Sequence, residues 1–136
     1  MASYDELAGR VVLITGGANG IGQAMVEAFH AQGAVVCFCD VDEKAGLWLA
    51  KRLGERAEFA KVNLCREVDI KRWVARLAKR HGAIHALINN AARDPRIALK
   101  DVTAKAWDEL FASNIRAQFL ALSLIHISEP TRRTPI

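Results

Sequence analysis

Residues 11–22 read VVLITGGANGIG, and this stretch decides the fold. Its first four residues are apolar β-formers without polar alternation, which predicts a parallel strand buried on both faces. A glycine-rich turn follows, and beyond Gly20 the apolar residues recur at helical spacing. A strand, a glycine turn and a helix in this order favour a dinucleotide site, because glycines let a pyrophosphate approach the main chain and the helix N-terminus attracts the anion.

The glycine spacing narrows the kind of site. Gly17 and Gly22 fit the frame of a nucleotide-triphosphatase loop, but Gln23-Ala24 stands where Lys-Ser/Thr is required. The pattern is instead T-G-x-x-x-G-x-G, which resembles the short-chain dehydrogenase/reductase family. A glycine-rich turn without a ligand is the alternative. The cofactor-binding residues predicted in this turn are Gly16, Asn19, Gly20, Ile21 and Gly22.

A second strand is expected at residues 34–40, and it ends on an acid. Asp40 lies 18 positions beyond Gly22, close to the offset of roughly 20 residues at which a carboxylate accepts hydrogen bonds from the adenosine ribose. A carboxylate there repels a 2′-phosphate, and neither Ala18 nor Asn19 supplies a cation. The sequence therefore predicts NAD as the cofactor, with NADP less favoured. The alternative is that Asp40 only caps the next helix.

The remaining pattern alternates strands and helices. Helices are expected at 43–53 and 67–81, and strands at 58–62 and 86–88, with Gly54 and Gly82 ending the two helices. This alternation predicts an α/β fold, a Rossmann-like doubly wound parallel sheet of strand order 3-2-1-4 that is truncated before the later strands. Ligands then bind at the carboxyl ends of the strands.

The resemblance covers residues 7–121 and adds further cofactor residues. Asn63-Leu64 stands where the family contacts the adenine ring, with Asn in place of the commoner Asp. Residues 89–92 read NNAA and resemble the family motif N-N-A-G, with Ala92 replacing the glycine. The resemblance implies that Asn90 and Ala91 border the cofactor.

A later helix carries the one catalytic residue that the resemblance implies. Thr103 is expected to cap this helix, and Trp107 and Asn114 are expected on the same buried face. In the resembled family the asparagine of this helix organises a water for proton relay, which makes Asn114 the candidate catalytic residue. A purely structural amide is the alternative.

The rest of the family's catalytic set is absent from the sequence. Members carry a serine and Tyr-x-x-x-Lys beyond this helix, whereas the single tyrosine here is Tyr4. The resemblance thus implies the N-terminal part of an NAD-dependent oxidoreductase that is inactive as given. A non-catalytic dinucleotide-binding module and an acyl-carrier ketoreductase fragment are the alternatives.

The segment from Leu122 onward has a different character. Pro130 and Pro135 fall there, and the helical spacing is expected to fail. Back-translated, residues 122–132 resemble the transposon end used to tag DNA in sequencing libraries. We therefore expect a Rossmann domain at 1–121 and a non-native tail at 122–136.

The substrate is constrained only loosely. The loop after the fourth expected strand resembles that of sugar and polyol dehydrogenases in this family, where Asp94 and Arg96 would meet substrate hydroxyls. A solvated pair of loop charges is an equal alternative. The resemblance implies a small-molecule alcohol or carbonyl substrate and a homo-oligomeric parent enzyme.

Composition limits other functions. The chain of 136 residues is 51% hydrophobic and carries a formal net charge of +4, with its basic residues scattered along helices, so no nucleic-acid partner is expected. No apolar run is long enough for a membrane span, and residues 1–7 lack a signal pattern, so a cytoplasmic location is expected. Three cysteines lack metal spacing and His81 and His85 are interpreted as surface residues, so no metal site is expected.

Overall fold

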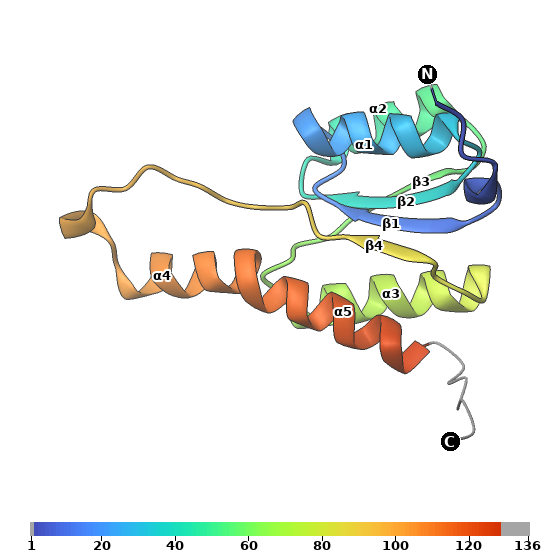
Figure 1. The fold of residues 1–136 in the computed structure, drawn as a ribbon. Coiled ribbons are helices and arrows are strands. Elements are labelled where there is room, and N and C mark those ends of the chain that lie inside the picture. The colour runs from blue at the N-terminus through green and yellow to red at the C-terminus, as the bar shows by residue number, and fades with distance from the viewer. Residues whose placement is uncertain (1, 129–136) are drawn as a thin grey trace.

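The computed structural model describes residues 2–128 and shows strands and helices in strict alternation over its first half (Figure 1). A short 3-10 helix, η1 (Asp5–Leu7), precedes the first strand. The elements that follow are β1 (Val11–Thr15), α1 (Gly20–Ala31), β2 (Val35–Asp40), α2 (Glu43–Leu53), β3 (Ala57–Lys61), α3 (Glu67–His81) and β4 (Ala86–Ile88). The predicted order of elements is confirmed, and their bounds agree to within one residue.

The four strands form one parallel sheet in the order β3-β2-β1-β4, as predicted. In its register Leu13 of β1 lies beside Cys37 of β2 and Leu87 of β4. Helices α1 and α2 cover one face of the sheet, and α3 and α5 cover the other (Figure 1). Because all the strands run the same way, their carboxyl ends meet at one edge of the sheet.

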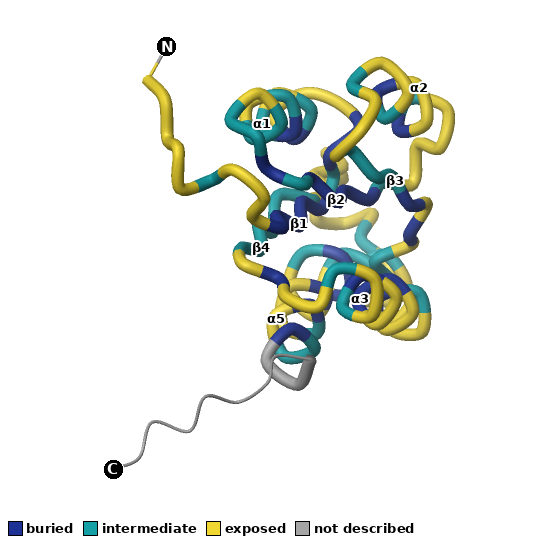
Figure 2. Tube along the Cα trace, turned by 90° about the vertical axis from the view of Figure 1, so that its right-hand side faces the viewer, coloured by how far each residue is buried: buried dark blue, intermediate teal, exposed yellow. Residues whose placement is uncertain are grey.

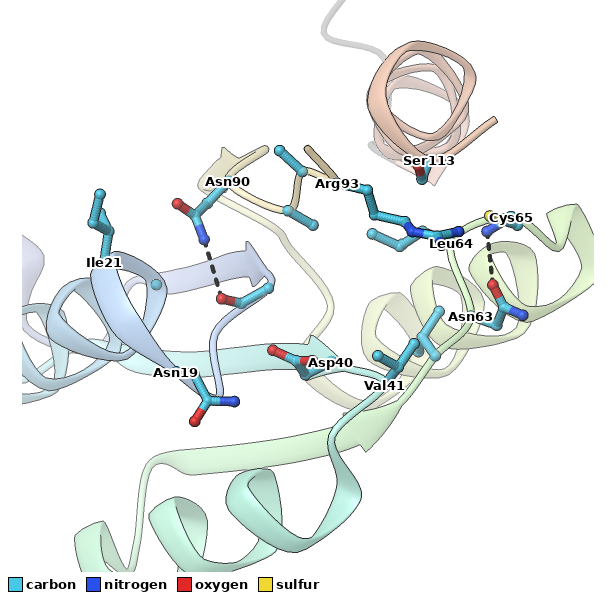
Figure 3. Close-up of a pocket in the computed structure, with 15 residues that line it drawn as sticks. Asn19, Ile21, Asp40, Val41, Asn63, Leu64, Cys65, Asn90, Arg93 and Ser113 are labelled. Carbon is cyan, nitrogen blue, oxygen red and sulfur yellow. Dashed lines mark hydrogen bonds between the residues drawn. The ribbon is translucent and has the colours of Figure 1, made fainter. Parts of the chain in front are cut away.

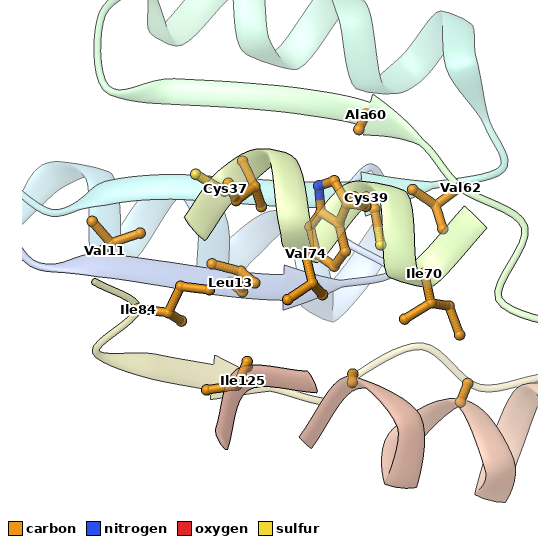
Figure 4. Close-up of a cluster of buried hydrophobic side chains, with 14 residues drawn as sticks. Val11, Leu13, Cys37, Cys39, Ala60, Val62, Ile70, Val74, Ile84 and Ile125 are labelled. Atoms are coloured by element: carbon orange, nitrogen blue, oxygen red, sulfur yellow. The ribbon is translucent and has the colours of Figure 1, made fainter. Parts of the chain in front are cut away.

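Both faces of the sheet are buried, which explains the unbroken apolar runs in β1 and β2. Successive residues of β1 point to opposite faces, so Leu13 packs toward α3 and α5 while Ile14 packs toward α1 and α2. Figure 2 shows the buried residues concentrated along the central strands. The larger cluster, shown in Figure 4, joins Leu13 to Trp73 and Val74 of α3 and to Ile125 of α5.

The second half of the chain has a different layout. An extended segment leaves β4, passes through the short 3-10 helix η2 (Leu99–Asp101), and reaches α4 (Ala104–Phe111). Thr103 caps α4 as predicted, its hydroxyl accepting a hydrogen bond from the Ala106 N–H at 3.1 Å. A π-helical turn, η3 (Ala112–Arg116), then leads into α5 (Ala117–Ser128).

Two expectations for this half were wrong. The helix face that carries Trp107 is exposed rather than buried. The Phe111 ring stacks on the Trp107 ring at a centroid distance of 4.7 Å, but the indole stays exposed. The helical spacing also does not fail directly after Leu122, because α5 continues to Ser128 and Ile125 is buried against α3. The rest of the expected tail, residues 129–136, lies outside the described residues.

Within residues 2–128, no helix combines the length and the apolar character that crossing a bilayer demands.

Candidate functional site: a dinucleotide cleft

A cavity of about 630 Å³ opens at the carboxyl ends of the strands, beside the glycine-rich turn (Figure 3). The turns that follow all four strands contribute to its wall. The lining residues are Gly16, Asn19, Ile21, Gly22, Asp40, Val41, Val62, Asn63, Leu64, Cys65, Asn90, Ala91, Ala92, Arg93 and Ser113.

The glycine turn is built by close main-chain contacts. Gly16 and Gly20 have positive φ angles of 67° and 57°, which favour glycine. A Cβ at Gly22 would lie 1.9 Å from the Gly16 carbonyl oxygen, and a Cβ at Gly16 would lie 2.9 Å from the Ala91 Cα. Glycine is therefore required at 16 and 22 for the start of α1 to pack against β1 and the segment after β4.

The segment after β4 is tied to the turn by a partly buried hydrogen-bond network. The Asn90 side chain donates to the Thr15 carbonyl at 3.2 Å and to the Gly16 carbonyl at 3.1 Å. The Thr15 hydroxyl in turn accepts from the N–H groups of Asn90 and Ala91, each at 3.1 Å. Asn90 lines the cavity as expected, but its amide serves to hold the turn in place.

The first turn of α1 borders the cavity through Ile21 and Gly22. Asn19 occupies the N-cap position, but its amide turns away and donates to Asp42 at 3.0 Å. The pKa of Asp42 is lowered, first by the hydrogen bond from the Ala45 N–H and then by the one from Asn19. Helix N-termini carry N–H groups without intrahelical partners, so this end of α1 suits an anion.

Asp40 is held at the end of β2 by two main-chain donors. Its Oδ2 accepts from the Ala18 N–H, and its Oδ1 accepts from the Asp42 N–H, both at 3.1 Å. The cap of α2 is Asp42, whose carboxylate accepts from Ala45, so the alternative that Asp40 caps this helix is wrong. Asp40 instead presents a fixed carboxylate on the cavity wall beside the glycine turn (Figure 3).

Apolar side chains frame the rest of this wall. Ile21 is 76% exposed and Val41 is 64% exposed, and both line the cavity. The neighbouring Asn63 has its Oδ1 engaged with the Cys65 N–H at 3.0 Å, which orders the loop after β3. Exposed apolar residues around a concave site are typical of a ligand site that buries part of its ligand.

Asn114 connects the π-helical turn to the segment after β4. Its Oδ1 accepts from the Arg93 N–H and its Nδ2 donates to the Arg93 carbonyl, both at 2.8 Å. Asn114 is adjacent in sequence to Ser113, which lines the cavity. Single π turns within helices occur often at functional sites.

The structure brings most of the predicted site residues into one cavity. Gly20 sets the turn without lining the cavity, and Asn114 stands behind Arg93. Asp94 and Arg96 lie exposed on the extended segment, outside the lining residues. Sequence reasoning missed Val41, Arg93 and the hydroxyl of Thr15. The position of Thr15, directly before the first glycine of the turn, was the one sequence signal that indicated a role for its hydroxyl.

The fold, the glycine turn and the anion-suited helix end define a nucleotide-binding Rossmann protein. The family model described as short chain dehydrogenase matches residues 10–126. The chain belongs to the short-chain dehydrogenase family, an oxidoreductase family that binds nicotinamide dinucleotides.

Named relatives agree with this family. A probable galactose dehydrogenase of Rhizobium meliloti strain 1021 is 41% identical over 87% of this chain and 48% of its own length. The L-fucose dehydrogenase of Oryctolagus cuniculus is 34% identical over 91% of this chain and 44% of its own length. The chain thus spans about half the length of these relatives.

Solved structures support the fold. A blue fluorescent protein from a metagenomic library, solved in complex with NADPH, has a TM-score of 0.85 and 28% identity, and the match covers 91% of this chain and 53% of that chain. A dehydrogenase from Brucella melitensis has a TM-score of 0.87 at 24% identity, over 94% of this chain and 54% of that chain.

Proposed function

We propose that this chain is the NAD-binding part of a dehydrogenase that moves hydride between nicotinamide and a small alcohol or carbonyl compound. The observation that carries the proposal is the fixed carboxylate of Asp40 beside the glycine turn. When bound, NAD supplies the hydride acceptor, or in reduced form the donor.

The residues of the cleft fit a dinucleotide. The Gly16 and Gly22 contacts fix the turn, whereas a Cβ at Gly20 would meet nothing within 4 Å, which leaves the main chain open to a pyrophosphate at the start of α1. Asp40 would accept hydrogen bonds from the adenosine ribose, and Ile21, Val41 and Leu64 would cover the apolar parts. Asn63, Asn90 and Ala91 complete the proposed cofactor site.

The preference for NAD over NADP rests on charge. A 2′-phosphate would meet the Asp40 carboxylate, and like charges in contact disfavour binding. Arg93 is the single cation among the lining residues, and it pairs with Glu109 of α4 at 3.8 Å. A carboxylate that accepts ribose hydrogen bonds contributes about 1.5–3 kcal/mol, or roughly ten- to a hundredfold in affinity.

The test compares NAD and NADP binding by calorimetric titration in the unmodified chain and in Asp40→Asn. We expect the unmodified chain to prefer NAD and the variant to shift the preference toward NADP by roughly ten- to a hundredfold. Asp42→Asn is the matched control, since it removes an adjacent carboxylate that does not line the cavity. Tighter NADP binding by the unmodified chain contradicts the proposal.

We further propose that Asn114 takes part in proton relay and that the chain alone does not turn over substrate. Hydride transfer to a carbonyl needs a proton donor near neutral pKa, which the family supplies from Tyr-x-x-x-Lys. The only tyrosine, Tyr4, is exposed, and its N–H donates to Gln32 at the end of α1. The chain joined to its downstream genomic sequence should oxidise an alcohol with NAD, and the chain alone should not.

For the substrate we propose a sugar or polyol. This rests on relatives named for galactose, L-fucose and sorbitol, and on the polar segment that carries Asp94 and Arg96. A substrate panel on the joined protein should show galactose, fucose or sorbitol oxidised faster than simple aliphatic alcohols. Faster reduction of acyl-carrier ketoesters would favour the ketoreductase alternative.

A further inference from the structure

Three potential metal ligands meet at a place that the dinucleotide cleft does not use. Cys37 lies in the middle of β2, Glu58 is its register partner on β3, and His81 is the last residue of α3. Cys37 precedes Asp40 by three residues, or about 10 Å along a strand. The cluster therefore lies toward the amino ends of the strands, away from the cavity.

The spacing of the ligand atoms fits tetrahedral coordination. The Cys37 Sγ lies 3.6 Å from the His81 Nε2, and the His81 Nε2 lies 3.2 Å from the Glu58 Oε2. All three ligand atoms lie within 4.8 Å of one another. A tetrahedral Zn²⁺ with its usual bond lengths separates sulfur from nitrogen by about 3.6 Å and nitrogen from oxygen by about 3.4 Å.

The donor set selects the metal. One thiolate, one imidazole and one carboxylate suit Zn²⁺ and disfavour Mg²⁺ or Ca²⁺, which prefer oxygen ligands alone. The charges of a thiolate and the Glu58 carboxylate together balance a divalent cation. A neutral assembly is favoured here because Cys37 is fully buried and the side chains of His81 and Glu58 are only 17% and 21% exposed.

The surroundings support the carboxylate as a ligand. Arg80 pairs with the Glu58 Oε1 at 3.3 Å, while the Oε2 faces His81. One oxygen is thus oriented by an arginine and the other is directed at the cluster, which is the arrangement that outer hydrogen bonds give to metal ligands. The partial exposure of His81 and Glu58 leaves a path from solvent.

We propose that Cys37, Glu58 and His81 form a zinc site that joins β2, β3 and the end of α3. A zinc ion in this place has three protein ligands and a fourth position open to water. It cross-links two strands and the helix packed on them, so its binding should stabilise the folded chain. The proposal is independent of the dinucleotide function.

The test is zinc titration of the purified chain against a chromophoric chelator, with Co²⁺ as a spectroscopic probe. We expect one Zn²⁺ per chain, a zinc-dependent rise in melting temperature, and sulfur-to-cobalt charge-transfer absorption. Cys37→Ala and His81→Gln each remove a ligand and should weaken zinc binding by at least about tenfold, the lower bound for losing even a partner that only orients a ligand. Circular dichroism establishes that each variant is folded.

Matched controls separate this site from adventitious binding. Cys39→Ala removes a thiol two residues along the same strand and face, and Cys65→Ala removes the partly exposed thiol. Both should keep the zinc affinity of the unmodified chain. Stoichiometric binding that survives Cys37→Ala and His81→Gln, or that disappears in Cys65→Ala, overturns the proposal, as does the absence of zinc binding.

The pH dependence is a second readout. Burial, followed by the charge of Glu58, raises the pKa of Cys37 to about 12, while Arg80 and Arg76 oppose the rise. His81 faces the same thiol. Zinc binding must displace the thiol proton, so the apparent affinity should strengthen about tenfold per pH unit between pH 7 and 9. A flat profile contradicts thiolate coordination.

Discussion

The β1–α1 turn and the segment running from α4 to α5 differ in how their residues are packed. In the turn, Gly22 meets the Gly16 carbonyl, and Asn90 and Thr15 engage the main chain on both sides. Along α4 and α5, an apolar stripe faces outward, and its exposed members are Trp107, Phe111, Ile115, Phe119 and Leu122. The residues of the turn are packed against other residues of the described chain, whereas the side chains of the stripe are exposed on its surface.

This difference orders the expected effects of substitution. A residue in the turn contacts main-chain atoms that cannot move aside, so its replacement affects the free energy of unfolding directly. A residue of the stripe contributes little to the stability of a single chain, and its replacement alters association instead. The following predictions run from the first kind to the second.

Gly22→Ala should have the largest effect. The added Cβ would lie 1.9 Å from the Gly16 carbonyl oxygen and 2.6 Å from the Asn90 Nδ2, so the turn must open. We expect the free energy of unfolding to fall by about 3 kcal/mol and dinucleotide binding to be lost. Urea denaturation and NAD titration measure the two effects.

Gly54→Ala is the control for backbone strain alone. Gly54 has a φ of 76°, and a Cβ there would meet nothing within 4 Å. Its replacement should cost about 1 kcal/mol and leave NAD binding unchanged. Equal losses in the two variants would show that the Gly22 contact is unimportant.

The same contrast explains how much the sequence predicted. The bounds of β1 and β4 follow from apolar runs and glycine spacing, which are local signals. The sheet order follows from the alternation of strands and helices, which is typical of a doubly wound sheet. The exposure of Trp107 could not be predicted, because helical periodicity gives the face of a helix but not what covers it. The meeting of Cys37 with Glu58 and His81 also depends on register between β2 and β3, which neither strand specifies alone.

In the site, the identity of the cavity residues was easier to predict than their roles. Asp40 lies on the cavity wall, at the offset from the glycines where the sequence predicts a carboxylate. The partners of Asn90 and Asn114 are main-chain groups, and the sequence pattern does not reveal such partners.

Thr15→Val should have the next largest effect. The Thr15 hydroxyl is buried and accepts hydrogen bonds from the Asn90 and Ala91 N–H groups. Valine has the same shape but leaves two partly buried donors without an acceptor, which costs about 2 kcal/mol. Thr15→Ser keeps the acceptor and should recover most of the loss in urea denaturation. If valine and serine behave alike, the hydroxyl does not hold this segment.

Asn114→Ala should have a smaller effect on stability. It removes two hydrogen bonds to the Arg93 main chain at a partly exposed position, for about 1 kcal/mol. Amide hydrogen exchange at Arg93 should accelerate because its N–H loses its acceptor. Ser113→Ala is the control, since the Ser113 hydroxyl bonds mainly to carbonyls of α4. Unchanged exchange at Arg93 in Asn114→Ala would contradict the observed pairing.

The smallest effect on the free energy of unfolding is expected for Phe119→Glu. Phe119 is 66% exposed on α5, so its replacement should change that free energy by less than about 0.5 kcal/mol. The same change places a charge within the apolar stripe, where association would have to desolvate it. We expect the unmodified chain to self-associate in sedimentation velocity and Phe119→Glu to sediment more slowly at equal concentration. Gln118→Glu adds the same charge at the adjacent exposed position and should leave association unchanged, because it does not interrupt the stripe. If the unmodified chain is monomeric and unfolds cooperatively, the exposed stripe does not drive association. The two regions would then differ only in how densely their residues are packed.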